Sequence, residues 1–189
     1  MKIIYIFTLM TLIVSTSTQA YSSKLWGNLN YGMSVSDVRK IYPDSKFLNI
    51  PEVMGAPTEK NPCRNILKLD SFKVAGYDFE SRFCFRENKL IQVLLEIKGK
   101  PNADDGLIAV ERVQGALLNE YGDPSSEKYN NYGAPMRGYE KLSRCQHRIL
   151  KWKKSEDLMI TLVFMVVTED LINLNIVYQN SNDIGFRNR

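Results

Sequence analysis

Hydrophobic and polar residues alternate in two stretches of the chain, and each stretch predicts a pair of strands. In residues 79–85 every second side chain is Phe or Ser, and the residues between them are charged or Cys, which is typical of a half-buried strand. A turn at residues 87–88 leads into an apolar strand over 90–97. The same order recurs 81 positions later, which predicts strands over 160–166 and 171–178.

A helix is predicted ahead of each pair of strands. Ser34 is a suitable N-cap with an acidic residue three positions later, and apolar residues up to Tyr42 share one helical face before Pro43 ends the helix. A longer amphipathic pattern predicts a second helix over 105–121, which Gly122 ends.

One further strand completes each unit. In the first unit it covers residues 68–74 and turns at 75–76 into the next strand, and in the second it covers 149–153. Landmarks of the two units lie 78 to 81 positions apart, so we interpret the chain as a repeat. The predicted class is α+β: a tandem repeat of a helix plus a three-stranded antiparallel meander, with the helices packed on one face of the sheet or sheets. The predicted units cover residues 21–100 and 101–180, and a flexible tail over 181–189 follows.

The N-terminal residues have the order of a secretory signal peptide. Lys2 precedes a 12-residue apolar run over 3–14, and the small polar residues 15–20 suit a signal-peptidase site after Ala20. Twelve apolar residues are too few to span a bilayer, which takes about 20. We therefore expect residues 1–20 to be a signal peptide and the protein to be exported from a bacterium, periplasmic or secreted, with no stable membrane span after cleavage. An uncleaved anchor is the alternative.

Composition narrows the function classes. The 189 residues are 44% hydrophobic and 24% charged with a net charge of +4, which is ordinary for a globular domain and too mild to favour nucleic acid. One His and three Cys exclude most structural zinc sites, so we expect no metal and no cofactor. We interpret His147 as a surface residue and Asp104 and Asp105 as helix-capping residues, so no catalytic residue is predicted.

The sequence around the first helix resembles that of a group of exported bacterial domains. Residues 26–34 (WGNLNYGMS), followed by Val38 and Tyr42-Pro43, are similar to the Leu-x-x-Gly-Met-Ser-x-x-x-Val opening of small outer-membrane-assembly lipoproteins and, in a two-unit version, of β-lactamase inhibitor proteins. The second helix keeps the Tyr-Gly-Asp-Pro ending of these domains at residues 121–124. The resemblance implies a fold and a habit of binding proteins, and it implies no catalytic residues.

The three cysteines allow at most one disulfide within the chain, and export permits disulfides. If the strand over 68–74 turns directly into the next one, Cys84 lies opposite Leu67 and about 13 Å along the strand from Cys63. Only a bend near Cys63 would then close a bridge between them. We predict the pairing Cys63–Cys84, and a Cys63–Cys145 bridge or no bridge are the open alternatives.

Two features predict a surface that contacts another protein. Residues 129–139 combine Tyr with Asn, Gly, Met and Arg, as binding loops do, although a solvated connector is the alternative. The outer side of the strand over 160–166 is apolar, which marks either a contact or a surface covered by a loop or a second subunit. Basic residues nearby suit either a solvated edge or an acidic partner. The candidate partner-binding residues are Tyr129, Tyr132, Met136, Arg137, Tyr139, Lys151, Lys153, Val163 and Met165.

Together these patterns predict an exported, non-catalytic protein-binding module, either inhibitor- or immunity-like or an accessory of envelope assembly. Its expected partner is a protein of the cell envelope or of the extracellular space, with a homodimer as a further option. The alternatives are an exported hydrolase with an unrecognised site and a homo-oligomeric structural protein of the envelope.

Overall fold

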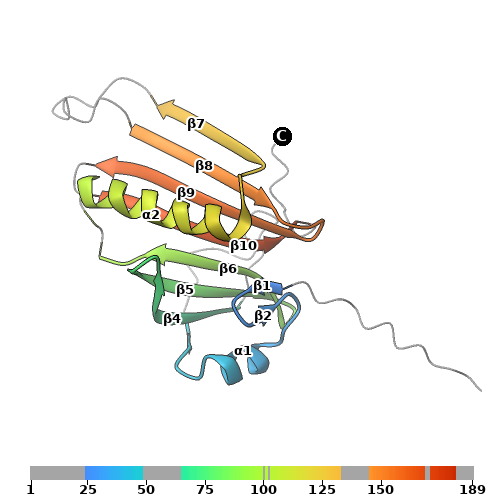
Figure 1. Ribbon diagram of the computed structural model, residues 1–189. Coiled ribbons are helices and arrows are strands. Elements are labelled where there is room, and N and C mark those ends of the chain that lie inside the picture. The colour runs from blue at the N-terminus through green and yellow to red at the C-terminus, as the bar shows by residue number, and fades with distance from the viewer. Residues whose placement is uncertain are drawn as a thin grey trace, which may run out of the picture.

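The structure is built on one antiparallel sheet of eight strands. The computed structural model describes residues 24–48, 65–99, 101, 103–132, 145–168 and 171–181. The strands of the sheet are β3 (Lys46–Phe47), β4 (Asn65–Val74), β5 (Tyr77–Arg86), β6 (Lys89–Ile97), β7 (Ser126–Tyr132), β8 (Cys145–Lys153), β9 (Leu158–Thr168) and β10 (Leu171–Asn180). They lie in the order β3-β4-β5-β6-β10-β9-β8-β7, so two four-stranded halves meet where β6 pairs with β10 (Figure 1).

One face of the sheet, which we call the inner face, is covered by the remaining elements. Helix α2 (Ala103–Tyr121) crosses this face over β9 and β10, and the small hairpin of β1 (Lys24–Trp26) and β2 (Leu29–Asn30) contacts β6 and β10 through β1. Helix α1 (Val35–Ile41) lies near the β4 side of the sheet (Figure 1). No helix in the described ranges is long and apolar enough to cross a membrane.

The predicted class, a tandem repeat of a helix plus a three-stranded meander with the helices packed on the sheet, is wrong. The described chain is mostly β, with two helices beside one large sheet. Each half has a further edge strand that alternation did not reveal, because β3 has only two residues and β7 contains no aliphatic side chain. Helix α1 has seven residues, of which only Val38 is buried, so it is too small to form a layer on the first half.

The predicted positions of strands and turns agree with the structure better than the predicted fold class does. All four residues of the turns at 75–76 and 87–88 have positive φ, between 50° and 89°. Such φ values at both central residues are typical of the type I′ turn, whose twist matches that of the flanking strands. The alternating residues expected in the core are at most 2% exposed: Phe79, Phe83, Phe85, Ile160, Leu162 and Phe164.

A β-bulge changes the predicted register of the first hairpin. The hairpin closes at the predicted turn, but the pairing of β4 with β5 shifts between Leu69 and Phe72. Beyond this shift Cys84 lies opposite Ile66 rather than Leu67. A bulge places an extra residue in one strand only, so it shifts the hydrophobic alternation along β4 from odd-numbered residues before the bulge to even-numbered residues after it.

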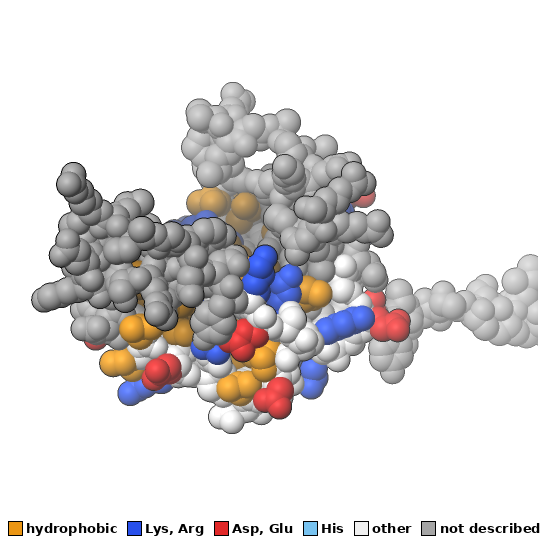
Figure 2. Space-filling model, turned by 90° about the horizontal axis from the view of Figure 1, so that it is seen from above, with side chains coloured by type: hydrophobic (Ala, Val, Ile, Leu, Met, Phe, Trp, Pro, Cys, Tyr) orange, Lys and Arg blue, Asp and Glu red, His pale blue; other side chains and the backbone are white. Residues whose placement is uncertain are grey.

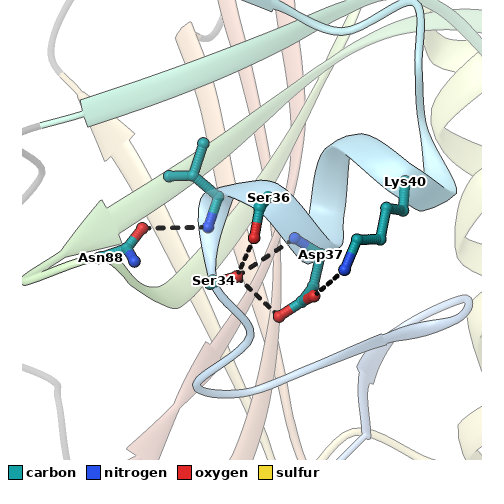
Figure 3. Close-up of polar contacts among 6 residues, drawn as sticks. Ser34, Ser36, Asp37, Lys40 and Asn88 are labelled. Atoms are coloured by element: carbon teal, nitrogen blue, oxygen red, sulfur yellow. Dashed lines mark hydrogen bonds and ion pairs between the residues drawn. The ribbon is translucent and has the colours of Figure 1, made fainter.

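Helix α1 begins at a cap that also ties it to the sheet (Figure 3). The Ser34 hydroxyl accepts a hydrogen bond from the Asp37 backbone N–H at 3.2 Å and donates one to the Asp37 carboxylate at 2.7 Å. Lys40 Nζ lies 3.0 Å from the same carboxylate. The Val35 N–H donates to the Asn88 side-chain oxygen at 3.2 Å, which links the helix to the β5–β6 turn. The predicted N-cap at Ser34 is thereby confirmed.

An aromatic cluster joins α1, β1 and both halves of the sheet on the inner face. The Trp26 ring lies 4.5 Å from Phe72 in an edge-on contact and 6.0 Å from Tyr42 in a stacked one, measured between ring centroids. It also lies 6.2 Å from Phe83 of β5 and 6.3 Å from Tyr178 of β10. Trp26 therefore contacts both halves of the sheet on the inner face, where β6 pairs with β10. Each aromatic pair adds about 0.5–1.5 kcal/mol of stability beyond that from burial.

Helix α2 is held against the sheet near both ends. Near the helix N-terminus, a Cβ atom added to Gly106 would lie 2.7 Å from Cγ1 of Ile172, which is a buried residue of β10. Just beyond the helix C-terminus, the Gly122 carbonyl accepts a hydrogen bond of 2.7 Å from the Trp152 indole on β8. The lack of a side chain at Gly106 is what allows the close approach.

Gly106→Ala is expected to lower the free energy of unfolding by about 1–3 kcal/mol, because the new methyl group must displace the buried Ile172. Gly115 of the same helix is the matched control, since no atom lies within 4 Å of an added Cβ there. Gly115→Ala should raise the free energy of unfolding by up to about 1 kcal/mol through helix propensity. Urea unfolding followed by circular dichroism measures both, and equal effects of the two substitutions would contradict the close packing at Gly106.

Candidate functional site

The opposite face of the sheet, which we call the outer face, carries no other described helix or strand. Side chains alternate along each strand, so residues next to inward-facing ones point outward. Phe83 and Leu162 are buried in the core, and their neighbours Arg82 and Val163 therefore belong to the outer face. At the contact between β6 and β10 the outer face divides into a β3–β6 half and a β7–β10 half.

The β3–β6 half carries charged side chains that pair with one another. Lys68 Nζ lies 2.7 Å from the Glu80 carboxylate and 3.2 Å from that of Asp70. Arg82 lies 2.8 Å from Glu80 and 3.0 Å from Glu96. Because Glu80 and Glu96 are directly opposite each other on β5 and β6, Arg82 offsets a repulsion that the sheet would otherwise impose. These five residues form one ion-pair network.

The network sets the ionisation of its central carboxylate. Burial raises the pKa of Glu80, but hydrogen bonds and charge from Lys68 and Arg82 outweigh it and lower the pKa below its ordinary value. The hydrogen bond with Glu80 likewise raises the pKa of Lys68. A carboxyl group with a lowered pKa stabilises the fold above its pKa in the unfolded chain, and the contribution is lost as the pH falls through its folded value.

The β7–β10 half has apolar side chains where the other half has ion pairs. Ile149 of β8 and Val163 of β9 lie directly opposite each other, and both are half-buried. Val177 of β10 is half-buried and lies opposite Thr161. Met165 is 36% exposed at the end of this group. Around the buried Thr161, four residues form an apolar surface that spans β8, β9 and β10: Ile149, Val163, Met165 and Val177.

Three lysines border this apolar surface. Lys128 of β7 lies opposite Ile149, Lys151 lies opposite Thr161, and Lys153 lies two residues further along β8. None of the three forms an ion pair with another described residue. No Asp or Glu stands at the outward positions of β7–β10 in the described ranges. Seen from above, Lys, Arg, Asp and Glu side chains are interspersed with hydrophobic ones on the described part of the surface (Figure 2).

Strand pairing brings together some of the predicted partner-binding residues and separates others. Four of them lie on the outer face of β8 and β9: Lys151, Lys153, Val163 and Met165. Tyr129 and Tyr132 belong to β7 rather than to a loop, and their backbones pair with those of Arg148 and Cys145. The other predicted residues lie outside the described ranges: Met136, Arg137 and Tyr139.

Sequence reasoning missed three residues of this surface, namely Lys128, Ile149 and Val177. Lys128 was missed because β7 was not predicted as a strand. Ile149 and Val177 belong to predicted strands, and the alternation of those strands could have placed them on the outward side. Their closeness to Val163, however, follows only from the strand order.

Arg148, which is three residues from Lys151 in the sequence, does not belong to this surface. Its guanidinium lies 2.7 Å from the Glu127 carboxylate and donates to the Gln114 side chain of α2 at 2.9 Å, so it points to the inner face. In the described part of the chain no group of three or more His, Cys, Asp or Glu residues is placed to hold a metal ion. What the outer face of β7–β10 offers is apolar contact area and positive charge.

Cys84 lies on the outer face of β5 and is engaged in a disulfide. Cys145 begins β8, four strands away, and strands about 4.8 Å apart put it about 19 Å or more from Cys84. That exceeds the roughly 7 Å between Cα atoms that a disulfide can bridge. Cys63 lies outside the described ranges, three positions before the Ile66 that faces Cys84. The register thus favours the pairing Cys63–Cys84, which stays a prediction.

Comparison of the chain with family models, curated proteins and solved structures finds no match. The resemblance to outer-membrane-assembly lipoproteins and β-lactamase inhibitor proteins therefore stays a prediction that rests on short motifs.

Glu80→Gln should lower the free energy of unfolding at pH 7 by about 1 kcal/mol, because the neutral amide leaves Lys68 and Arg82 without their shared carboxylate. Since the pKa of Glu80 is lowered on folding, the loss should be present in full well above about pH 4.3, the usual pKa of an unfolded Glu, and shrink below it. Asp78→Asn is the control, because Asp78 pairs with Lys73 at 3.6 Å in an exposed position. Urea unfolding at neutral and acidic pH measures both, and a pH-independent loss would contradict the network.

Mass analysis of the non-reduced protein is expected to show one disulfide between Cys63 and Cys84 and a free thiol at Cys145. The reason is that the sheet holds Cys145 four strands away from Cys84, which is too far for a disulfide. Peptide mapping after alkylation without reductant identifies the labelled residue. Three alkylated cysteines, or a linked peptide that contains Cys145, would show that the pairing is wrong.

Proposed function

We propose that this protein is an exported, non-catalytic protein-binding module that contacts its partner through the β7–β10 half of the outer face. The observation that carries the proposal is the apolar surface of Ile149, Val163, Met165 and Val177, which no other described helix or strand covers. Apolar side chains gathered on one face of a protein usually mark a contact with another molecule.

The composition of this surface suits a protein partner. Interfaces combine an apolar centre with a polar rim, and Met is among the residues enriched at their centres. Here Val163 and Met165 supply the apolar centre, and Lys151 and Lys153 stand at its border. A flat sheet face offers a broad contact of this kind, whereas a small-molecule site is a concave pocket with converging polar groups.

Export and the role of the module are supported by the sequence alone. Residues 1–20 have the order of a signal peptide, and residues 26–34 resemble the helix opening of envelope-assembly lipoproteins and β-lactamase inhibitor proteins. The proposed roles are accordingly inhibition or neutralisation of another protein, or assistance in envelope assembly.

A photo-crosslinking amino acid in place of Met165 is expected to join the protein to a discrete partner when the full chain is expressed in its native host. Met165 is exposed at the end of the apolar surface, so the reactive group would lie inside the proposed contact. The adduct is measured by gel shift and its partner identified by mass spectrometry. Met165→Asp should weaken binding of that partner by about 1–4 kcal/mol, the range of hot-spot truncations, without changing the circular dichroism spectrum.

Leu107 is the matched control position. It is 41% exposed and lies on α2, which covers the opposite face. The same amino acid at Leu107 should give no adduct with the partner. An adduct from Leu107 and none from Met165 would place the contact on the helix side, and an adduct of twice the chain mass would identify a homo-oligomer instead.

A further inference from the structure

We propose that the protein partner presents an acidic surface to the β7–β10 half of the outer face, with carboxylates that pair with Lys128, Lys151 and Lys153 around the apolar contact. This inference rests on the proposed function and names the chemistry of the partner. Its basis is that the lysines beside the apolar surface form no ion pair with described residues, whereas the network on the β3–β6 half pairs its cations within the chain.

The ion-pair network of the β3–β6 half already pairs its two cations. Lys68 and Arg82 each contact two carboxylates of their own chain at distances from 2.7 to 3.2 Å. An acidic partner that approached this network would have to compete with those internal ion pairs, and it would meet three carboxylates against two cations. The network therefore disfavours an acidic surface at its own position on the sheet.

The lysines of the β7–β10 half have no ion-pair partner among the described residues. Lys151 and Lys153 are two residues apart on one strand, about 7 Å along it, and Lys128 lies opposite Ile149 next to Lys151. None of them pairs with a described carboxylate. Three like charges in such a group create a positive potential, which a surface of opposite sign relieves and which steers that surface toward contact.

The apolar surface between the lysines favours an acidic protein over a nucleic acid. Nucleic-acid sites need many phosphate-contacting cations and aromatic rings for base stacking, and the net charge of the chain is only +4. Val163 and Met165 offer aliphatic contact instead, which matches the apolar centre and charged rim of a protein interface.

The inference is tested first with synthetic peptides in which Leu alternates with Glu, Gln or Lys, added to the isotopically labelled protein without residues 1–20. The Glu peptide should shift backbone amide signals of β8 and β9 and bind at least tenfold more tightly than the Gln peptide at low salt. The Lys peptide should not bind. High salt should remove the advantage of the Glu peptide, because exposed charges are screened. The inference would be overturned if the Glu and Gln peptides bound equally tightly, or if neither of them bound.

The lysines are tested by the triple substitution Lys128→Gln, Lys151→Gln and Lys153→Gln. We expect this variant to bind the Glu peptide at least tenfold more weakly and to reduce the yield of the Met165 crosslink by a similar factor. Its circular dichroism spectrum and urea midpoint should match those of the unmodified protein, since these lysines make no described ion pair.

A charge-matched control separates local pairing from net charge. It carries Lys24→Gln, Lys46→Gln and Lys89→Gln, three exposed lysines outside β7–β10. The control should bind the Glu peptide as the unmodified protein does. Equal loss in the control and in the test variant would overturn the inference, because net charge alone would then explain the effect.

The outcomes distinguish this inference from the proposed function. If Met165 crosslinks to a partner but the triple substitution leaves the yield unchanged, the proposed function stands and the acidic partner is wrong. If the Glu peptide binds but Met165 gives no adduct, the proposed function is wrong. Vesicles that contain about one third phosphatidylglycerol are the remaining test, and binding to them as tight as to the Glu peptide would overturn the choice of a protein over a lipid surface.

Discussion

The pairing of β6 with β10 is the contact on which the rest of the structure depends. Five successive residue pairs, from Glu96–Asn175 to Gln92–Gln179, join the two four-stranded halves into one sheet. Without this ladder each half would expose an additional strand edge with unpaired backbone groups. The first half would also lack cover, because α1 buries only Val38. In the joined sheet Trp26 contacts Phe83 in one half and Tyr178 in the other, so this side chain covers the inner face of both halves.

The single sheet gives the molecule two chemically different faces. The inner face is enclosed by α2 and the β1–β2 hairpin, and the alternating Phe, Leu, Ile and Val side chains that face it are almost completely buried. The outer face is left for polar and half-buried residues. On it the β3–β6 half carries an ion-pair network centred on Glu80, whereas the β7–β10 half combines apolar residues with lysines that form no ion pair with a described residue. This asymmetry along one face is the feature that suits partner recognition.

Local pattern predicted the strands and turns that have strong signals. The alternating phenylalanines of β5, the positive-φ turns at 75–76 and 87–88, and the N-cap at Ser34 were all correctly expected, because each depends on residues close in sequence. The fold class was wrong, because it depends on features that local pattern does not contain. These are the two-residue strand β3, the polar edge strand β7 and the pairing of β6 with β10 that joins the halves into one sheet.

The candidate surface divides in the same way. The sequence by itself determined that Val163 and Met165 share one side of a strand and that Lys151 and Lys153 share one side of another, because alternation is a property of a single strand. Only the tertiary structure decided that these sides coincide, that Lys128, Ile149 and Val177 join them, and that Arg148 turns inward to Glu127. The reason is that strand order follows from long-range backbone pairing and shared burial, in which residues far apart in the chain become neighbours.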